Sequence, residues 1–180
     1  SERTTLALTP PNHGNAQKFS FENLTAVGEI TINNRNELLK YVGETNVSDG
    51  ELLLRLYSKY GIDGFSQIDG MFTAAISDGE TLLLVRDAIG ARTLFYTDTG
   101  VCFVASSSLR ALKKEAKRSF RLNLSAVASF LTFAYLPGSE TLLEDVFELL
   151  PGHALLIKAD GKTELTNYYE PQEYFIHLDS

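Results

Sequence analysis

The stretch LLLVRDAIGARTLFY, residues 82–96, places two charged side chains directly after a run of apolar residues. Residues 82–85 are typical of a buried strand, and Arg86 and Asp87 follow them before the chain bends at Gly90. A buried charge without a partner is very costly, so these side chains need either partners or a chemical task. An adjacent acid and base could move a proton, although nothing else in the stretch supplies a nucleophile. The stretch alone leaves two alternatives open. Either both side chains have partners at a structural corner, or they form a catalytic acid–base pair.

Other residues that commonly act as nucleophiles or metal ligands are scattered along the chain. Cys102 is the single cysteine, which excludes a disulfide framework, and its apolar neighbours in VCFVAS predict a buried, inert thiol. His13, His153 and His177 lie far apart in the sequence without flanking ligands, so we expect no metal site. A glycine-rich phosphate-binding loop is also absent from the sequence.

Local signals predict four helices that could position these residues. Ser48 and Glu51 have the spacing of a capping box, and the apolar stripe that follows ends at Gly61. NRNELLKYVG, residues 34–43, predicts a shorter helix before it. Two more are predicted in SSLRALKKEA and in NLSAVASFLTFAYLP, the second capped by Asn123 or Ser125.

Paired strands are predicted between these helices. MFTAAIS and ETLLLVR flank Asp78-Gly79, a dipeptide that accepts a type I′ turn. Two further hairpins are RTLFYT with VCFVAS, and the segment GHALLIKADGKTELTNYY. LTAVGEI, residues 24–30, predicts a strand that stops near Gly28 and Glu29. The first two hairpins do not alternate cleanly, so both faces of their sheet should be covered, which indicates an α+β domain with stacked sheets.

Length and composition limit the class of protein. The 180 residues, 44% hydrophobic and 22% charged, suit one domain, with a departing tail or linker at 170–180. A formal charge of −7 argues against nucleic acid as a partner. No apolar stretch approaches the roughly 20 residues that span a bilayer, and no signal peptide opens the sequence. We therefore expect no membrane partner and a cytoplasmic location.

Several stretches match one family in chain order. They are VGEITINNRNELL, VSDGELLLRLYSKYG, DGMFTAAISDGETLLLVRDAIGARTLFY, FVASS and LLPGHALLI. Together they resemble the glutaminase domain of asparagine synthetases, a class II glutamine amidotransferase, from about Leu24 to Tyr169. The resemblance implies a four-layer αββα sandwich of antiparallel sheets, of the N-terminal nucleophile hydrolase type, with the first strands missing. It also places the family's Arg-Asp pair at a strand-to-loop corner, which favours a structural, ion-paired role for Arg86, Asp87 and Gly90.

The sequence departs from the family where the chemistry would occur. The family attacks glutamine with an N-terminal cysteine whose α-amino group is the base, whereas this sequence begins with Ser1. Ser1 is not a convincing replacement, because TTLAL, residues 4–8, aligns with a later family strand. The arginine that grips the substrate carboxylate should follow TTLAL, where the sequence reads Thr9-Pro10-Pro11. Val27 replaces the oxyanion-hole asparagine, a loss worth about 3–4 kcal/mol of transition-state stabilisation in comparable sites.

Three positions match substrate-binding residues of the family. Gly28 and Glu29 match the Gly-Glu that lines the glutamine pocket, and Asp49 matches the aspartate that holds the α-ammonium group. Each also has a structural interpretation: a tight strand end at Gly28, an exposed Glu29, and negative charge near a helix N-terminus at Asp49. Because the nucleophile, the arginine and the asparagine are all absent, we favour the structural interpretations and a vestigial pocket without catalytic residues.

The resemblance implies a type-2 glutamine amidotransferase-like domain, residues 1–169, of an asparagine-synthetase-like enzyme that forms amides with ATP. Like β-lactam synthetases, it would lack glutaminase activity and act as a scaffold beside a synthetase domain or subunit. ATP and Mg²⁺ are implied only for that synthetase part, whose Ser-Gly-Gly-x-Asp-Ser loop does not occur in this sequence. No cofactor is expected for the present domain.

Two alternatives stay open. The domain could be an active glutaminase that supplies ammonia, with its nucleophile upstream or on another chain. It could instead be a non-catalytic interaction module, because 8 tyrosines and 11 phenylalanines provide aromatic surface for docking a subunit or for forming a homodimer.

Overall fold

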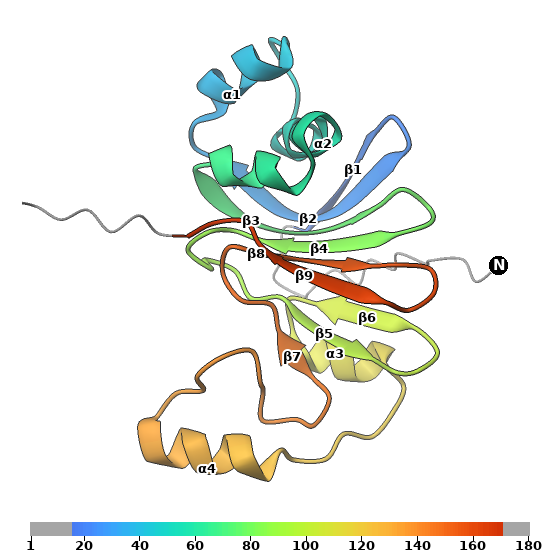
Figure 1. The fold of residues 1–180 in the computed structure, drawn as a ribbon, viewed down its shortest axis with the longest axis vertical. Coiled ribbons are helices and arrows are strands. Elements are labelled where there is room, and N and C mark those ends of the chain that lie inside the picture. The colour runs from blue at the N-terminus through green and yellow to red at the C-terminus, as the bar shows by residue number, and fades with distance from the viewer. Residues whose placement is uncertain (1–15, 171–180) are drawn as a thin grey trace, which may run out of the picture.

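Two antiparallel sheets form the centre of the computed structural model, which describes residues 16–170 (Figure 1). The larger sheet has the strand order β1-β2-β3-β4-β8-β9. Its strands are β1 Gln17–Phe21, β2 Leu24–Ile32, β3 Gly70–Ser77, β4 Leu82–Arg86, β8 His153–Ile157 and β9 Thr163–Asn167. The smaller sheet has the order β6-β5-β7, with β5 Phe95–Asp98, β6 Phe103–Ser106 and β7 Phe147–Glu148.

Helices cover the outer sides of both sheets. α1 Arg35–Val42, α2 Asp49–Tyr60 and the 3₁₀ segment η1 Gly61–Gln67 lie on the larger sheet. α3 Leu109–Glu115 and α4 Leu124–Phe133 lie on the side of the smaller sheet. Figure 1 therefore shows helices, sheet, sheet and helices in succession, and the predicted αββα sandwich is confirmed.

The helices begin and end where the local signals predicted. Ser48 caps α2 by accepting a hydrogen bond at 3.2 Å from the backbone N–H of Glu51, and Gly61 follows its last turn with a positive φ of 64°. Gly43 ends α1 in the left-handed conformation. Asn123, one of the two predicted caps, accepts the N–H of Ala126 at the start of α4.

Two apolar cores hold the layers together. One lies between α1, α2 and the larger sheet and includes Leu52, Leu56, Phe65 and Phe72, each at most 1% exposed. The other lies between the two sheets and includes Leu84, Leu94, Leu149 and Leu155. Every residue of β4 is buried, so this strand is covered on both faces as its unbroken apolar sequence predicted.

The predicted end of the strand at Gly28 and Glu29 is wrong, because β2 continues to Ile32. Gly28 pairs with Ala74 and Glu29 with Thr73 in the regular β2–β3 register. A Cβ atom at Gly28 would lie 2.1 Å from the carbonyl oxygen of Thr73, so glycine permits close approach of two backbones here and does not break the strand.

The predicted type I′ turn at Asp78-Gly79 is also wrong. The connection has four residues, 78–81, between the paired Ser77 and Leu82, and of the Asp-Gly pair only Gly79 has a positive φ. The Asp78 carboxylate organises the loop by accepting the N–H groups of Glu80 at 2.9 Å and Thr81 at 2.7 Å.

Cys102 is exposed, so the predicted buried thiol is wrong. It lies in the turn between β5 and β6, where its N–H donates to Thr99 Oγ1 at 3.1 Å. Within residues 16–170 no helix has the length and apolar composition needed to cross a bilayer, and no cluster of three potential metal-ligating side chains occurs. Ser1, the TTLAL stretch, Thr9 to Pro11, His13, His177 and the tail from residue 171 lie outside the described residues.

Candidate functional site

The Arg86 side chain is enclosed at the corner where β4 ends. The residue is 5% exposed, and its guanidinium group donates four hydrogen bonds. Nε donates to the carbonyl of Arg92 at 2.5 Å, and Nη2 to that of Gly90 at 3.0 Å. Nη1 donates to the carbonyl of Leu149 at 2.6 Å and to Glu148 Oε1 at 2.8 Å. The guanidinium group thus joins β4, the loop after it and β7.

Asp87 is fully buried and is held mainly by backbone N–H groups. Its Oδ1 accepts from Ile89 at 3.2 Å and from Ala91 at 3.1 Å, and Oδ2 accepts from Phe72 at 3.4 Å. The ion-pair partner of Arg86 is therefore Glu148, and the Asp87 charge is satisfied by peptide dipoles. The three hydrogen bonds to Asp87 involve no side-chain nucleophile.

Gly90 and Tyr168 complete the corner. Gly90 has a φ of 68°, and a Cβ atom there would lie 2.6 Å from Pro151 Cγ and 3.2 Å from Arg86 Nη2. The Tyr168 hydroxyl donates to the Arg86 carbonyl oxygen. Burial, with a smaller contribution from the charge of Asp87, raises the pKa of Tyr168 well above its ordinary value.

Glu29 is connected to this corner through Arg92. Its side chain is 18% exposed, so it is not the exposed residue of the structural interpretation, and Oε2 lies 3.2 Å from Arg92 Nε. The Arg92 carbonyl in turn accepts from Arg86. The structure therefore brings Glu29 on β2 together with the corner, which the sequence did not indicate.

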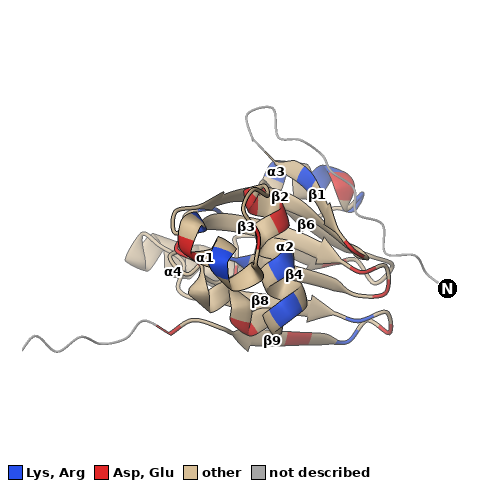
Figure 2. Cartoon of the chain, turned by 90° about the horizontal axis from the view of Figure 1, so that it is seen from above, with Lys and Arg blue, Asp and Glu red and all other residues tan. Residues whose placement is uncertain are grey.

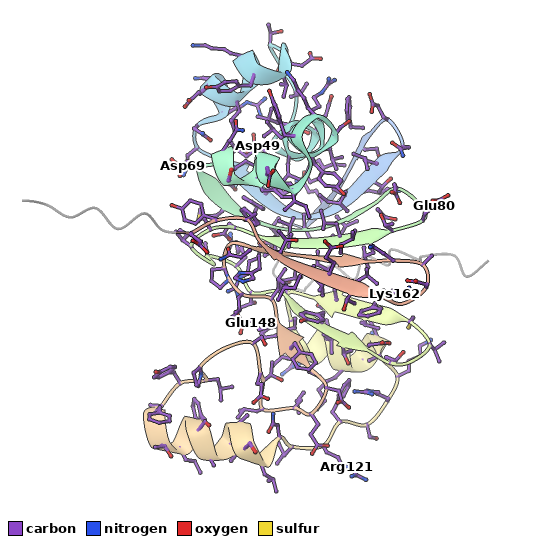
Figure 3. All side chains as sticks on the ribbon, viewed as in Figure 1. Asp49, Asp69, Glu80, Arg121, Glu148 and Lys162 are labelled. Carbon is purple, nitrogen blue, oxygen red and sulfur yellow. The ribbon has the colours of Figure 1, made fainter. Side chains whose placement is uncertain are left out.

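Asp49 lies on the helix side of the larger sheet, whereas Glu148 lies on the side of the smaller sheet (Figure 3). Asp49 Oδ1 accepts from Arg35 Nη1 at 2.5 Å, and Oδ2 accepts the N–H of Ile32 at 3.0 Å. Arg35 also donates to the carbonyl of Val47. Both carboxylate oxygens of Asp49 are therefore engaged within the chain, one of them by a cation.

Sequence reasoning missed Arg35, Arg92, Glu148 and Tyr168. Each contacts a predicted residue from a distant part of the chain, up to 82 residues away for Tyr168 and Arg86. A hollow of about 270 Å³ beside α4 and β7 is lined by none of the predicted site residues. Lys and Arg residues and Asp and Glu residues both occur along the described elements in Figure 2.

Comparison with known proteins is consistent with this architecture. A family model described as "Glutamine amidotransferase domain" matches residues 22–169. Asparagine synthetase [glutamine-hydrolyzing] 1 of Bacillus subtilis is 27% identical over 125 residues, which are 68% of this chain and 20% of that protein. Carboxyethyl-arginine beta-lactam-synthase of Streptomyces clavuligerus is 32% identical over 87 residues, 47% of this chain and 17% of that protein.

A solved structure shares the fold. Glutamine phosphoribosylpyrophosphate amidotransferase from B. subtilis, in complex with ADP and GMP, matches with a TM-score of 0.61 and 16% identity, covering 86% of this chain and 32% of that one. At this identity the likeness supports the fold and nothing further. The matched region amounts to 24%, 20% and 19% of three curated relatives, so the chain spans about a quarter or less of their length.

Proposed function

Because the chain belongs to the glutamine amidotransferase domain family, we propose that it is the amidotransferase-type part of an asparagine-synthetase-like enzyme that forms amides with ATP. We further propose that this domain neither binds nor hydrolyses glutamine and serves as a scaffold for a synthetase domain or subunit.

The ion pair of Arg35 with Asp49 is the observation that carries the proposal. Asp49 is the position expected to receive the α-ammonium group of glutamine, and a guanidinium group already lies 2.5 Å from its Oδ1. A substrate ammonium would meet a carboxylate whose charge this cation already partly neutralises, which reduces the free energy that the ammonium can gain there. Millimolar binding amounts to only about 4 kcal/mol, and a charged hydrogen bond is worth about 1.5–3 kcal/mol, so losing this contact weakens binding by one to two orders of magnitude.

The oxyanion position supports the same conclusion. Val27, on β2 directly before Gly28, has no side-chain donor where the family resemblance expects asparagine. Loss of one hydrogen-bond donor from an oxyanion hole lowers kcat by a factor of about 10²–10³. The single cysteine, Cys102, lies in a turn of the smaller sheet, whereas Gly28 and Glu29 lie in the larger sheet.

The scaffold role rests on the relatives. Their names describe asparagine synthetases and a β-lactam synthase, and each is several times longer than the region matched here. In such an enzyme the synthetase part would use ATP and Mg²⁺ to activate a carboxylate. The present domain would contribute a folded surface to that part.

Titration with L-glutamine tests the proposal. We expect no saturable heat in calorimetry up to about 10 mM glutamine, roughly tenfold above a millimolar dissociation constant. Saturable binding that Asp49→Asn abolishes and Asp63→Asn preserves would overturn it, because Asp63 is an exposed carboxylate of η1 outside the site.

An active glutaminase whose nucleophile is upstream or on another chain is the second candidate, favoured by the retained Gly28, Glu29 and Asp49. It predicts release of glutamate from glutamine when the gene product includes any residues that precede Ser1. Absence of glutamate release from that longer product would dismiss the second candidate.

A further inference from the structure

Ile89 is held outward by a loop whose backbone is fixed. The residue is 76% exposed, although it follows the buried Asp87 by only two positions. Asp87 Oδ1 accepts the N–H groups of Ile89 at 3.2 Å and Ala91 at 3.1 Å, and the Asp87 carbonyl accepts that of Gly90 at 3.2 Å. Because this backbone is already ordered, enclosing the Ile89 side chain costs little further conformational entropy, which favours binding at this loop.

Two more exposed apolar side chains lie close to Ile89. A Cβ atom at Gly90 would lie 2.6 Å from Pro151 Cγ, and one at Gly152 would lie 3.2 Å from Tyr169 Cβ. Pro151 is exposed and Tyr169 is 38% exposed. We call Ile89, Pro151 and Tyr169 the corner patch, because they lie around the corner where β4 ends.

The described part of the chain ends at the corner patch. Its last residue, Glu170, directly follows Tyr169, and the stretch 171–180 reads PQEYFIHLDS. That stretch contains one run of three apolar residues, YFI at 174–176, which follows Pro-Gln-Glu. Five residues in extended conformation span about 17 Å, so Phe175 can reach across the patch from Glu170.

We propose that residues 174–176 bind back onto the corner patch and enclose Ile89. Attachment favours this segment over a separate molecule, because a segment on a short flexible linker has an effective concentration in the millimolar range at a site that it can reach. A contact with a dissociation constant of about 1 mM is too weak to hold a separate protein at ordinary concentrations, but the attached segment occupies it for about half of the time. Removal of Ile89 and Phe175 from water supplies the favourable free energy.

A fluorescent reporter tests the contact. The chain has no tryptophan, so Phe175→Trp introduces a single indole at the proposed contact. In the chain of residues 1–180 we expect its emission maximum at a shorter wavelength than that of N-acetyltryptophanamide in the same buffer, because the indole leaves water when the segment binds. An emission maximum equal to that of the free amide overturns the proposal.

Ile89→Ser in the Phe175→Trp background identifies the surface. It should weaken the contact about tenfold and move the maximum to longer wavelength. Val101→Ser is the matched control, because Val101 is also β-branched and is 86% exposed in the β5–β6 turn, and it should leave the maximum unchanged. Equal shifts in the two variants overturn the proposal. A short-wavelength maximum that is lost on dilution also overturns it, because that result would assign the contact to a second copy.

Disulfide formation is an independent measurement. In a Cys102→Ser background, the Ile89→Cys and Phe175→Cys pair should form an intramolecular disulfide, because side chains in contact bring the Cα atoms within the limit of about 7 Å. The pair of Val101→Cys with Phe175→Cys is the control and should remain reduced under the same conditions. Equal oxidation of the two pairs contradicts binding at the corner patch. Neither measurement involves glutamine, so the inference stands or fails separately from the proposed function.

Discussion

Replacing Arg86 with alanine should destabilise this domain far more than replacing an exposed arginine. The substitution removes the donor from the carbonyls of Gly90, Arg92 and Leu149 and from the carboxylate of Glu148. All four acceptors belong to the corner that joins β4 to β7 and to the loop after β4. The variant therefore tests whether the corner is a structural clamp.

The magnitude follows from the exposure of those acceptors. The Glu148 side chain is 31% exposed and can regain water, so its loss contributes little. A carbonyl left without its donor costs about 1–3 kcal/mol, and water entering the space of the guanidinium group offsets part of that. We expect a loss of about 3–5 kcal/mol in the free energy of unfolding. For a domain of this size that corresponds to a fall in Tm of about 10 °C.

Urea unfolding followed by circular dichroism measures the effect, with Arg110→Ala as the control because Arg110 is exposed on α3. A difference below about 0.5 kcal/mol between the two variants would refute the clamp. Adding Glu148→Ala to the Arg86→Ala variant identifies the cause. We expect the double variant to regain almost no stability, because the unpaired carbonyls account for most of the loss. A gain of about 2 kcal/mol in the free energy of unfolding would instead assign the loss to the unpaired Glu148 carboxylate.

Two further predictions concern a tyrosine and the cysteine. Burial raises the pKa of Tyr168, so its contribution to stability is complete below about pH 10, the unfolded value, and is lost as the pH rises further. Tyr168→Phe should therefore lose less stability than the wild type between about pH 10 and 12 in urea titrations, and parallel losses would contradict this. Cys102 is exposed, so we expect one equivalent of thiol to react with Ellman's reagent without denaturant, and a thiol that reacts only in urea would contradict its placement.

The sequence predicted the helices because their signals are local. The hydrogen bond between Ser48 and the Glu51 N–H spans three residues, as does that between Asn123 and the Ala126 N–H. The errors concern contacts with distant backbone. Glycine is a residue type that often ends a strand, but the role of Gly28 depends on β3, which begins 42 residues later at Gly70. Sequence reasoning that looks only at neighbours assigns such a glycine to a break.

The candidate site was predictable only in part, for the same reason. Arg86 and Asp87 were identified as charges that need partners, yet Glu148 lies 62 residues from Arg86 and could not be named. Arg35 lies 14 residues before Asp49, and nothing in that interval indicates a pair. The two approach because β2 leads into α1 and then α2, so that Arg35 at the start of α1 meets Asp49 at the start of α2.

The charged side chains of the candidate site are held by contacts within the chain, and this limits what a ligand could gain there. Arg86 and Asp87 are buried and saturated by groups of the chain itself, and both oxygens of Asp49 are engaged. A ligand at the Arg86 corner would have to break those contacts before making its own, whereas Asp49 is 28% exposed and shares its charge with Arg35. The proposed lack of glutamine binding therefore rests mainly on the charge that Arg35 already supplies to Asp49.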